Sequence, residues 1–541
     1  MKKTILTGAS ILALSMAAPA FAQNNSTVDQ DGDDNVATVG QTGSNTSTID
    51  QDALGAGAFV TQTGSANVST VIQADNSAQN SINLPEDPEA TVVQNGNNNT
   101  QVTNQDAVAP GFNLVANTTQ TGDNNFSDID QDADGPGFSG SIRTNVTQSG
   151  DAFSTITQVA GNSNARNIFA TVNQSESISD IDQTASGNNA VGLTANVTQT
   201  SNSVSDIDQT ASGDKSGDLL ASVNQSNGAF SSIQQTAAGT ESVTQDAIVT
   251  QDGDSDSFIT QTFNNDGTNT FFAKVNQDGT GNLSTITQQD EGFGIIGNAD
   301  GGLTADVNQT GDGNTSGLFQ ENKSATADVD QTGDNNESFG NQGTAGNDLT
   351  VLQSGDGNLS DIFQRGLNNE ANVVQEGNGA TSDIDQFGRN DFAYVDQLTG
   401  SDGSLSVIQQ LGAGGPQSFS TASVEQSGAS NESLIIQDGF SNVADVLQSG
   451  DDNDSDVFQT GTVSGDKNEA DIDQTGDDNT SFLDQTGSLL KATVVQSGSD
   501  NLSDILQDGT SNTATVTQSS DGNVSFVTQM GAGSTATVTQ N

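Results

Sequence analysis

The sequence has 541 residues, of which 70 are Asp or Glu and 11 are Lys or Arg, and it contains no His, Cys or Trp. Hydrophobic residues make up 31% of the chain, which is too little to fill the several globular cores expected at this length. A chain without Cys and His excludes zinc fingers, iron–sulfur clusters, His-ligated haem, thiol nucleophiles and imidazole bases. A formal net charge of −59 argues against binding to nucleic acids and to anionic membranes.

Residues 1–22 have the pattern of a secretory signal peptide. Lys2 and Lys3 form a basic start, an apolar run begins at about Ile5, and residues 20–22 match an A-x-A cleavage motif. The apolar run is shorter than a membrane span, and no later segment is apolar enough to insert into a bilayer. We therefore expect residues 23–541 to be secreted, with no membrane insertion.

The chain after residue 22 is built from a repeat that is marked by glutamines. They recur every 11 residues from Gln309 to Gln397 and again from Gln474 to Gln540. The sequence between successive glutamines follows the pattern Q-x-G-x-x-N-x-[SA]-x-[VI]-x-Q, in which small, apolar and amide residues alternate with variable ones. This alternation predicts a strand with one regular, buried face, and the Gly, Asp and Asn residues after each Gln predict a tight turn.

Stacked repeats explain why half of the predicted buried face is polar. A lone buried amide costs a few kcal/mol, but identical amides one strand apart can donate and accept hydrogen bonds along the stack. We predict an all-β, two-sheet, cross-β solenoid of about 42 strands, two per coil and about 21 coils, on the order of 100 Å long. The predicted structural ladder near the C-terminal end comprises Gln474, Gln485, Gln496, Gln507, Gln518, Gln529, Gln540, Asn501, Asn512 and Asn523.

The repeat is interrupted in places between residues 74 and 302. The larger interruptions run from Ala74 to Glu89 and from Asp290 to Gly302, and the glutamine intervals in this part alternate between short and long. Longer loops on one exposed edge of a solenoid are thermodynamically cheap. We therefore predict one repeat domain over residues 23–541, with longer edge loops in residues 74–302.

The repeat resembles that of curlin, the subunit of bacterial curli fibres. The segment from Gln507 through Gly509, Asn512 and Ala514 to Gln518 matches the core of the curlin pattern S-x5-Q-x-G-x-x-N-x-A-x3-Q in order and spacing. The resemblance covers essentially the whole chain after residue 22. It implies a structural subunit of extracellular amyloid fibres that acts in adhesion and biofilm matrix, with a nucleator subunit and an outer-membrane export channel as partners.

The residues themselves also favour self-association. A solenoid whose last Gln is Gln540 exposes an unpaired strand edge at which another chain can pair. Some phenylalanines lie at odd offsets before their Gln, which places them on the outward face, where they are candidates for fibre bundling or surface attachment. These possible outward contact residues are Phe59, Phe126, Phe258, Phe482 and Phe526.

A different class of function remains as an alternative. Acidic turns, such as those containing Asp31 and Asp451, could hold Ca²⁺, which would make the protein a monomeric calcium-dependent or ligand-binding surface solenoid. The G-G-x-G-x-D nonapeptide of calcium-binding β-rolls does not occur, and solubility is the simpler role for these charges. Outward threonines at residues 513–517 and 535–539 give a local resemblance to ice-binding solenoids. We expect no catalytic residues, no metal and no cofactor.

Overall fold

The computed structural model describes most of the chain after the predicted signal sequence. The described residues are 23–75, 88–107, 113–133, 140–161, 166–214, 216–239, 243–264, 269–290, 302–321, 324–412 and 418–541. The predicted signal sequence, most of the interruption between Ala74 and Glu89, and most of that between Asp290 and Gly302 lie outside these ranges. The described part of the chain contains 40 β-strands, and none of its elements is a helix long and apolar enough to cross a membrane.

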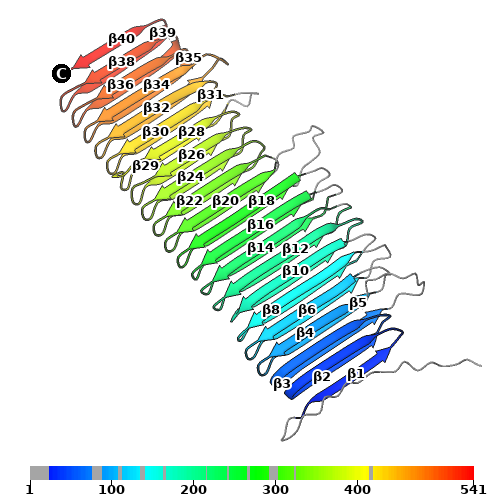
Figure 1. The fold of residues 1–541 in the computed structure, drawn as a ribbon. Helices are drawn as coiled ribbons and strands as arrows, with labels where there is room; N and C mark the ends of the chain where they lie inside the picture. Colours follow the sequence, from blue (N-terminus) through cyan, green and yellow to red (C-terminus); the bar gives the residue numbers. More distant parts are fainter. Residues whose placement is uncertain are drawn as a thin grey trace, which may run out of the picture. The chain divides into compact units, whose positions relative to one another are not determined.

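The described residues fall into two compact units, residues 23–271 and residues 272–541, which are described separately. In both units the strands run parallel. The first four strands pair in succession, β1 with β2, β2 with β3 and β3 with β4. From β3 onwards each strand also pairs with the strand two positions along the chain, so that odd-numbered strands pair with odd-numbered ones and even-numbered with even-numbered ones (Figure 1). This pairing is that of a parallel β-solenoid. The fold is therefore all-β, as the sequence predicts.

The first unit contains two long strands and two series of shorter ones. The long strands β2 (Val36–Asp52) and β3 (Gly57–Asp75) pair with each other along their whole length, with a register shift at Ser44 and Thr46. The odd-numbered strands are β1 (Asn25–Asp31), β5 (Thr100–Ala107), β7 (Phe126–Ala133), β9 (Phe153–Ala160), β11 (Ile178–Ala185), β13 (Val204–Ala211), β15 (Phe230–Ala237) and β17 (Asp256–Phe263). The even-numbered strands are β4 (Glu89–Asn95), β6 (Asn113–Thr121), β8 (Ser141–Ser149), β10 (Arg166–Ser175), β12 (Val191–Thr200), β14 (Leu219–Ser226) and β16 (Val243–Asp252).

The second unit has the same pairing and more uniform strands; the strand β18 (Asn269–Asp278) contains the boundary between the units. The odd-numbered strands are β19 (Leu283–Asp290), β21 (Thr315–Glu321), β23 (Glu337–Gln342), β25 (Leu359–Gln364), β27 (Thr381–Gln386), β29 (Leu405–Gln410), β31 (Glu432–Gly439), β33 (Asp454–Gly461), β35 (Thr480–Ser488), β37 (Leu502–Thr510) and β39 (Val524–Ala532). The even-numbered strands are β20 (Leu303–Thr310), β22 (Thr326–Thr332), β24 (Asp348–Ser354), β26 (Glu370–Gln375), β28 (Phe392–Gln397), β30 (Thr421–Ser427), β32 (Asn442–Ser449), β34 (Asn468–Thr475), β36 (Lys491–Gln496), β38 (Thr513–Gln518) and β40 (Thr535–Gln540).

The core is a set of columns in which like residues are stacked in register. In β27 the buried residues are Ser382, Ile384 and Gln386, and they alternate with outward ones. In the next strand, β28, the corresponding buried residues are Ala393, Val395 and Gln397. Most odd-numbered strands of the second unit thus carry Ser and a large aliphatic residue, whereas most even-numbered ones carry Ala and Val. The structural period is therefore two sequence repeats, with slightly different packing in each half.

One coil of the second unit departs from this pattern and compensates for it. Gly340 of β23 occupies the position of Ile362 in the next odd-numbered strand. A Cβ atom at Gly340 would lie 2.7 Å from Cδ1 of Leu349 and 2.8 Å from Cδ2 of Leu318. Leu349 itself occupies a position that Ala371 holds one coil later. The larger Leu349 thus fills the volume that Gly340 leaves, which keeps the core packed.

The turns depend on glycines whose backbone faces the next coil. Gly450 has a φ of +120°, and a Cβ atom there would lie 2.2 Å from the carbonyl oxygen of Gly476. Asn431 Nδ2 donates to the carbonyl oxygen of Gly450 at 2.8 Å, and Asn453 Nδ2 donates to that of Gly476 at 2.8 Å. Glycine is therefore required at this position of the repeat both for its left-handed backbone and for the close approach of successive turns.

Candidate functional site

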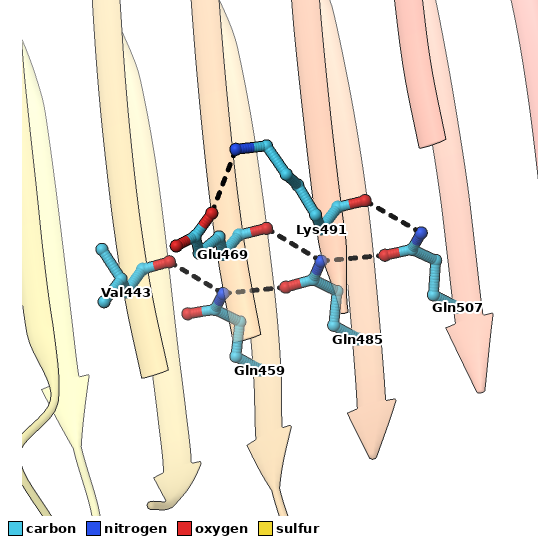
Figure 2. A network of polar contacts seen from close by, with 6 residues as sticks. All are labelled: Val443, Gln459, Glu469, Gln485, Lys491 and Gln507. Atoms are coloured by element: carbon cyan, nitrogen blue, oxygen red, sulfur yellow. Dashed lines mark hydrogen bonds and ion pairs between the residues drawn. The ribbon is translucent and has the colours of Figure 1, made fainter. Parts of the chain in front are cut away.

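The most regular polar feature is a ladder of buried glutamine amides. In the odd-numbered strands of the second unit, Gln459 Nε2 donates to Gln485 Oε1 at 2.8 Å, and Gln485 Nε2 donates to Gln507 Oε1 at 2.8 Å (Figure 2). These three side chains are at most 1% exposed. Each amide thus donates one hydrogen bond to the glutamine of the next coil and accepts one from the glutamine of the preceding coil.

Each ladder amide also donates to the backbone of the neighbouring strand series. Gln459 Nε2 bonds the carbonyl oxygen of Val443 at 2.9 Å, Gln485 Nε2 bonds that of Glu469 at 3.0 Å, and Gln507 Nε2 bonds that of Lys491 at 3.0 Å (Figure 2). The second N–H of each amide therefore links an odd-numbered strand to an even-numbered one. Because both N–H groups and the oxygen of the amide are bonded, its burial leaves no unsatisfied group.

The glutamines named in the sequence analysis lie in two such ladders. Gln474, Gln496, Gln518 and Gln540 are joined by three successive bonds of 2.9 Å along the even-numbered strands. Gln485, Gln507 and Gln529 are joined by bonds of 2.8 and 2.7 Å along the odd-numbered strands. In the sequence the glutamines recur every 11 residues, and in the structure they belong alternately to two ladders, in each of which the glutamines are 22 residues apart.

The asparagines at the turns form a second kind of ladder. Asn501 Nδ2 donates to Asn479 Oδ1 and Asn523 Nδ2 donates to Asn501 Oδ1, both at 3.0 Å. Asn512 belongs to the other strand series, where its Nδ2 donates to the carbonyl oxygen of Gly531 at 3.1 Å and its Oδ1 accepts from the backbone N–H of Ser534 at 2.9 Å. The asparagines therefore satisfy turn backbone as well as one another.

The ladders persist while the loops between them change in length. Partners along a ladder are 21 residues apart from Gln30 to Gln51 and 32 apart from Gln62 to Gln94, yet the bonds are 2.6 and 2.7 Å long. In the first unit the longer connections all follow odd-numbered strands: Ala185 to Val191 after β11 and Ala211 to Leu219 after β13 are examples. The register is therefore set by the inward side chains and not by loop length.

The outward phenylalanines lie on five different strands and are not brought together. Phe59, Phe258 and Phe482 are 39%, 37% and 38% exposed, and Phe526 is 69% exposed. Phe482 and Phe526 both align with Asp504 of the strand between them. These residues therefore form separate apolar points and not a continuous patch.

Three of the five rings have an aromatic neighbour that the sequence analysis did not name. Phe126 stacks on Phe153 of the next odd-numbered strand, with ring centroids 4.6 Å apart and planes 8° apart. Phe258 lies 5.7 Å from Phe230, and Phe482 lies 5.5 Å from Phe458. The stacked pair was detectable from the sequence, because Phe126 and Phe153 each lie five residues before a ladder glutamine.

The outward carboxylates lie in rows that repel one another. Asp180 and Asp206 align across β11 and β13, as do Asp182 and Asp208. Partial burial raises the pKa values of Asp180 and Asp206 above their usual range, and repulsion by neighbouring carboxylates raises them further. These rows therefore oppose both folding and close contact between molecules at neutral pH.

One carboxylate is held inside the fold. Asp391 occupies the position of the turn asparagine, and its Oδ1 accepts hydrogen bonds from Ser418 Oγ at 2.7 Å and from the backbone N–H of Ser420 at 2.9 Å. Its Oδ2 is buried with no hydrogen-bond partner in the described structure. Burial raises the pKa of Asp391 to about 6, although the bond from Ser418 opposes that rise.

The predicted alternatives depend on acidic turns and outward threonines. In the described ranges, no group of three or more Asp or Glu side chains has an arrangement that could hold a metal ion. Thr513, Thr515 and Thr517 of β38 align with Thr535, Thr537 and Thr539 of β40, and all face outward. The threonine array at this end thus comprises two strands.

Comparison with known proteins identifies the repeat in the C-terminal part of the chain. The curlin associated repeat matches residues 344–377, 377–410, 434–461, 464–487, 490–519 and 509–541. These matches include most of the strands from β24 onwards, but not β30. A search of curated proteins found no match to the chain. The C-terminal part of the chain thus carries six curlin associated repeats folded as a parallel β-solenoid.

Proposed function

We propose that the protein is a secreted structural subunit of extracellular, curli-like amyloid fibres that act in adhesion, surface attachment and biofilm matrix. In this proposal, residues 23–541 form two facing sheets of about 21 coils, and copies add end to end. The repeat family supports a structural role over an enzymatic one. A nucleator subunit and an outer-membrane export channel are proposed partners, by analogy with the same family.

The observation that carries the proposal is the complementarity of the two ends of the ladders. In the second unit each ladder glutamine donates to the glutamine of the following coil, and among the described residues Gln529 and Gln540 are the last of their ladders, so each has an amide N–H without a glutamine acceptor. Gln30 and Gln41 donate to Gln51 and Gln62, and within the described residues no earlier glutamine donates to their Oε1 atoms. Donors at one end thus match acceptors at the other.

The strands at these ends are also less covered than those inside the stack. The inward residues Ala536, Val538 and Gln540 of β40 are partly exposed, whereas their counterparts in β38 are buried. In β1 the inward residues Val28 and Gln30 are likewise partly exposed. A second copy stacked on β39 and β40 would bury these residues and continue the backbone pairing.

The first experiment is assembly in the absence of metal ions. Residues 23–541 are diluted from denaturant into metal-free buffer, and assembly is followed by thioflavin fluorescence and fibre diffraction. Fibres with a meridional repeat of about 4.7 to 4.8 Å are expected. A soluble monomer that becomes rich in β-structure only with Ca²⁺ would overturn the proposal and favour the calcium-dependent surface solenoid.

A matched pair of variants tests the end contact itself. Val538→Asp places a carboxylate among the inward residues of β40, where the next copy would stack, and it should reduce the rate of fibre elongation at least tenfold. Thr537→Asp places the same charge on the outward side of the same strand and should have a much smaller effect. Equal effects of the two variants would contradict end-to-end addition through β40.

The exposed phenylalanines are proposed contacts for bundling and attachment. Replacing Phe59, Phe258 and Phe526 by Ser should reduce fibre bundling in micrographs and the retention of fibres on an apolar surface. The substitutions leave the ladders intact, so thioflavin-positive fibres should still form. Unchanged bundling and retention would remove these residues from the proposed function.

A further inference from the structure

The outward side chains at the ends of five even-numbered strands in the first unit form an uncharged surface, with Arg143 of β8 lying one outward position before it. On β6, β8, β10, β12 and β14 the last three outward positions carry Thr, Asn or Ser. These positions form three columns that run across the strands in register. The neutral face comprises Asn117, Asn145, Thr171, Asn196 and Ser222 in the first column, Thr119, Thr147, Asn173, Thr198 and Asn224 in the second, and Thr121, Ser149, Ser175, Thr200 and Ser226 in the third.

This composition is unusual for a chain with a net charge of −59. Three odd-numbered strands of the same unit, β7, β11 and β13, carry carboxylates at the corresponding outward positions, which are Asp128, Asp130, Asp132, Asp180, Asp182, Asp206 and Asp208. Some even-numbered strands of the second unit are also acidic, with Asp328 and Asp330 on β22 and Asp471 and Asp473 on β34. The neutral face is therefore a run of five adjacent paired strands without carboxylates at these positions, in a chain that places rows of carboxylates on other strands.

The neutral face is exposed and regular. Several of its residues are exposed to solvent, among them Asn145, Thr147, Asn196 and Thr198. Asn117 Nδ2 donates to Asn145 Oδ1 at 3.0 Å, so part of the first column is already an amide ladder. Strands in a sheet are spaced about 4.8 Å apart, and outward residues along a parallel strand about 6.6 Å apart. The face thus presents a flat grid of hydroxyl and amide groups.

We propose that the neutral face is a lateral contact between two copies of this chain. Two acidic molecules can approach closely only where their carboxylates do not meet, and the neutral face provides such a region. Its grid also has the same spacing in both copies, so that rows of Thr, Asn and Ser can interdigitate as they do between paired amyloid sheets. This contact is sideways and does not depend on the end-to-end addition proposed above.

The area available is consistent with a weak contact in isolation that becomes strong in a fibre. Five strands and three outward positions cover about 500 Å² per copy, or about 1,000 Å² in a pair, at the lower limit for a specific interface. Two fibres present the face once per subunit, so many weak contacts act together. Asp123, Asp151 and Glu176 lie in exposed turns beside the face, so added salt should strengthen pairing by screening them.

The test compares charged variants of matched threonines. Thr147→Asp with Thr198→Asp places two carboxylates on the neutral face, immediately before ladder glutamines. Thr157→Asp with Thr260→Asp places two carboxylates at the same strand position on the odd-numbered strands β9 and β17, and this variant is the control. Both pairs are made in residues 23–541 carrying Val538→Asp, so that end-to-end growth is suppressed, and circular dichroism checks that each variant is folded.

The readout is self-association by sedimentation equilibrium at 0.05 and 0.5 M NaCl. The chain that carries only Val538→Asp is the parent, and it should dimerise, more tightly at high salt. The two substitutions on the neutral face should weaken dimerisation at least tenfold, and the two control substitutions should weaken it less than threefold. A parent that stays monomeric up to 0.2 mM, or equal effects of the two variants, would overturn the proposal. Loss of binding to cellulose or ice in the neutral-face variant, without loss of dimers, would assign the face to a polyol or to ice and also overturn it.

The lateral contact and the end contact can fail separately. If the Val538→Asp chain still forms fibres, the end contact proposed above is wrong, and lateral pairing is then measured as fibre width in micrographs. The neutral-face variant should give single, narrow fibres where the control gives paired ones. Paired fibres of equal width in both variants would contradict the lateral contact regardless of how the copies join at their ends.

Discussion

Replacing Gln485 by Leu should open the ladder in the middle of the second unit. The substitution removes the bonds from Gln485 to Gln507 and to the carbonyl oxygen of Glu469, and the bond that Gln459 donates. It leaves two buried oxygens and one buried N–H without partners, at about 1–3 kcal/mol each. Burial of the apolar Leu side chain stabilises the fold by about 2 kcal/mol, which offsets part of this cost. The expected net loss is about 3 kcal/mol of local unfolding free energy.

The matched control is Gln540→Leu in β40. Gln540 accepts one ladder bond from Gln518 and donates one to the carbonyl oxygen of Val524, both near the exposed end of the stack. Water can replace these partners because Gln540 is partly exposed, so the expected loss is about 1 kcal/mol or less. The difference between the two variants isolates the effect of burial from that of removing an amide.

Amide hydrogen exchange on residues 23–541 is the suitable assay, because a repeat array does not unfold in a single two-state step. A loss of about 3 kcal/mol corresponds to exchange roughly 100-fold faster in peptides covering β33 to β37 of the Gln485→Leu variant. The Gln540→Leu variant should show faster exchange only in β38 to β40. Acceleration below threefold in β33 to β37 would refute the view that the ladder amides are fully satisfied and stabilising.

Three further sets of substitutions test the packing, the turns and the buried carboxylate. Gly340→Ile and Leu349→Ala should each destabilise the adjacent strands in hydrogen exchange, by about 1–3 kcal/mol through overpacking and about 2–5 kcal/mol through a cavity, and the double variant should recover most of the loss. Gly450→Ala should accelerate exchange in its turn far more than Gly522→Ala, because a Cβ atom at Gly522 has no atom within 4 Å. Asp391 has a folded pKa of about 6 against an ordinary 3.8, so its contribution to stability is present below pH 4 and is lost as the pH rises through 6. Asp391→Asn should therefore stabilise the fold at pH 7 by about 3 kcal/mol. The thermal stability of this variant should vary less between pH 4 and pH 7 than that of the unsubstituted protein.

The sequence predicts the solenoid well because its signal is repeated many times. Each repeat contains the same alternation of Ser or Ala, Ile or Val, and Gln, so a single strand assignment applies to many strands, and parallel stacking follows from the like residues. The same regularity hides the difference between odd and even strands. Ser382 with Ile384 and Ala393 with Val395 follow a 22-residue period that becomes clear once the strand pairing is known.

The functional surfaces were less accessible to sequence reasoning. The bonds from ladder glutamines to the carbonyl oxygens of the other strand series join residues 16 apart in Gln485 and Glu469, and no residue pattern marks a backbone acceptor. Asp391 could have been recognised, because it replaces the asparagine five residues after Gln386. The elevated pKa of Asp391 could not have been recognised from the sequence, because it depends on the burial of the carboxylate beside Ser418.

The direction of the ladder bonds gives the stack a polarity that loops do not affect. Gln375 donates to Gln397 at 2.9 Å over 22 residues, and Gln397 donates to Gln426 at 2.8 Å over 29 residues. Because the ladder glutamines of the second unit donate toward the C-terminal end, an added copy continues the glutamine hydrogen bonding only if it stacks with the same orientation. Lateral contact through outward Thr and Asn residues does not involve the ladder bonds and therefore does not require the two copies to have the same orientation. Elongation should therefore be sensitive to inward substitutions at β39 and β40, and pairing to outward substitutions at β6 to β14, with little effect of either set on the other process.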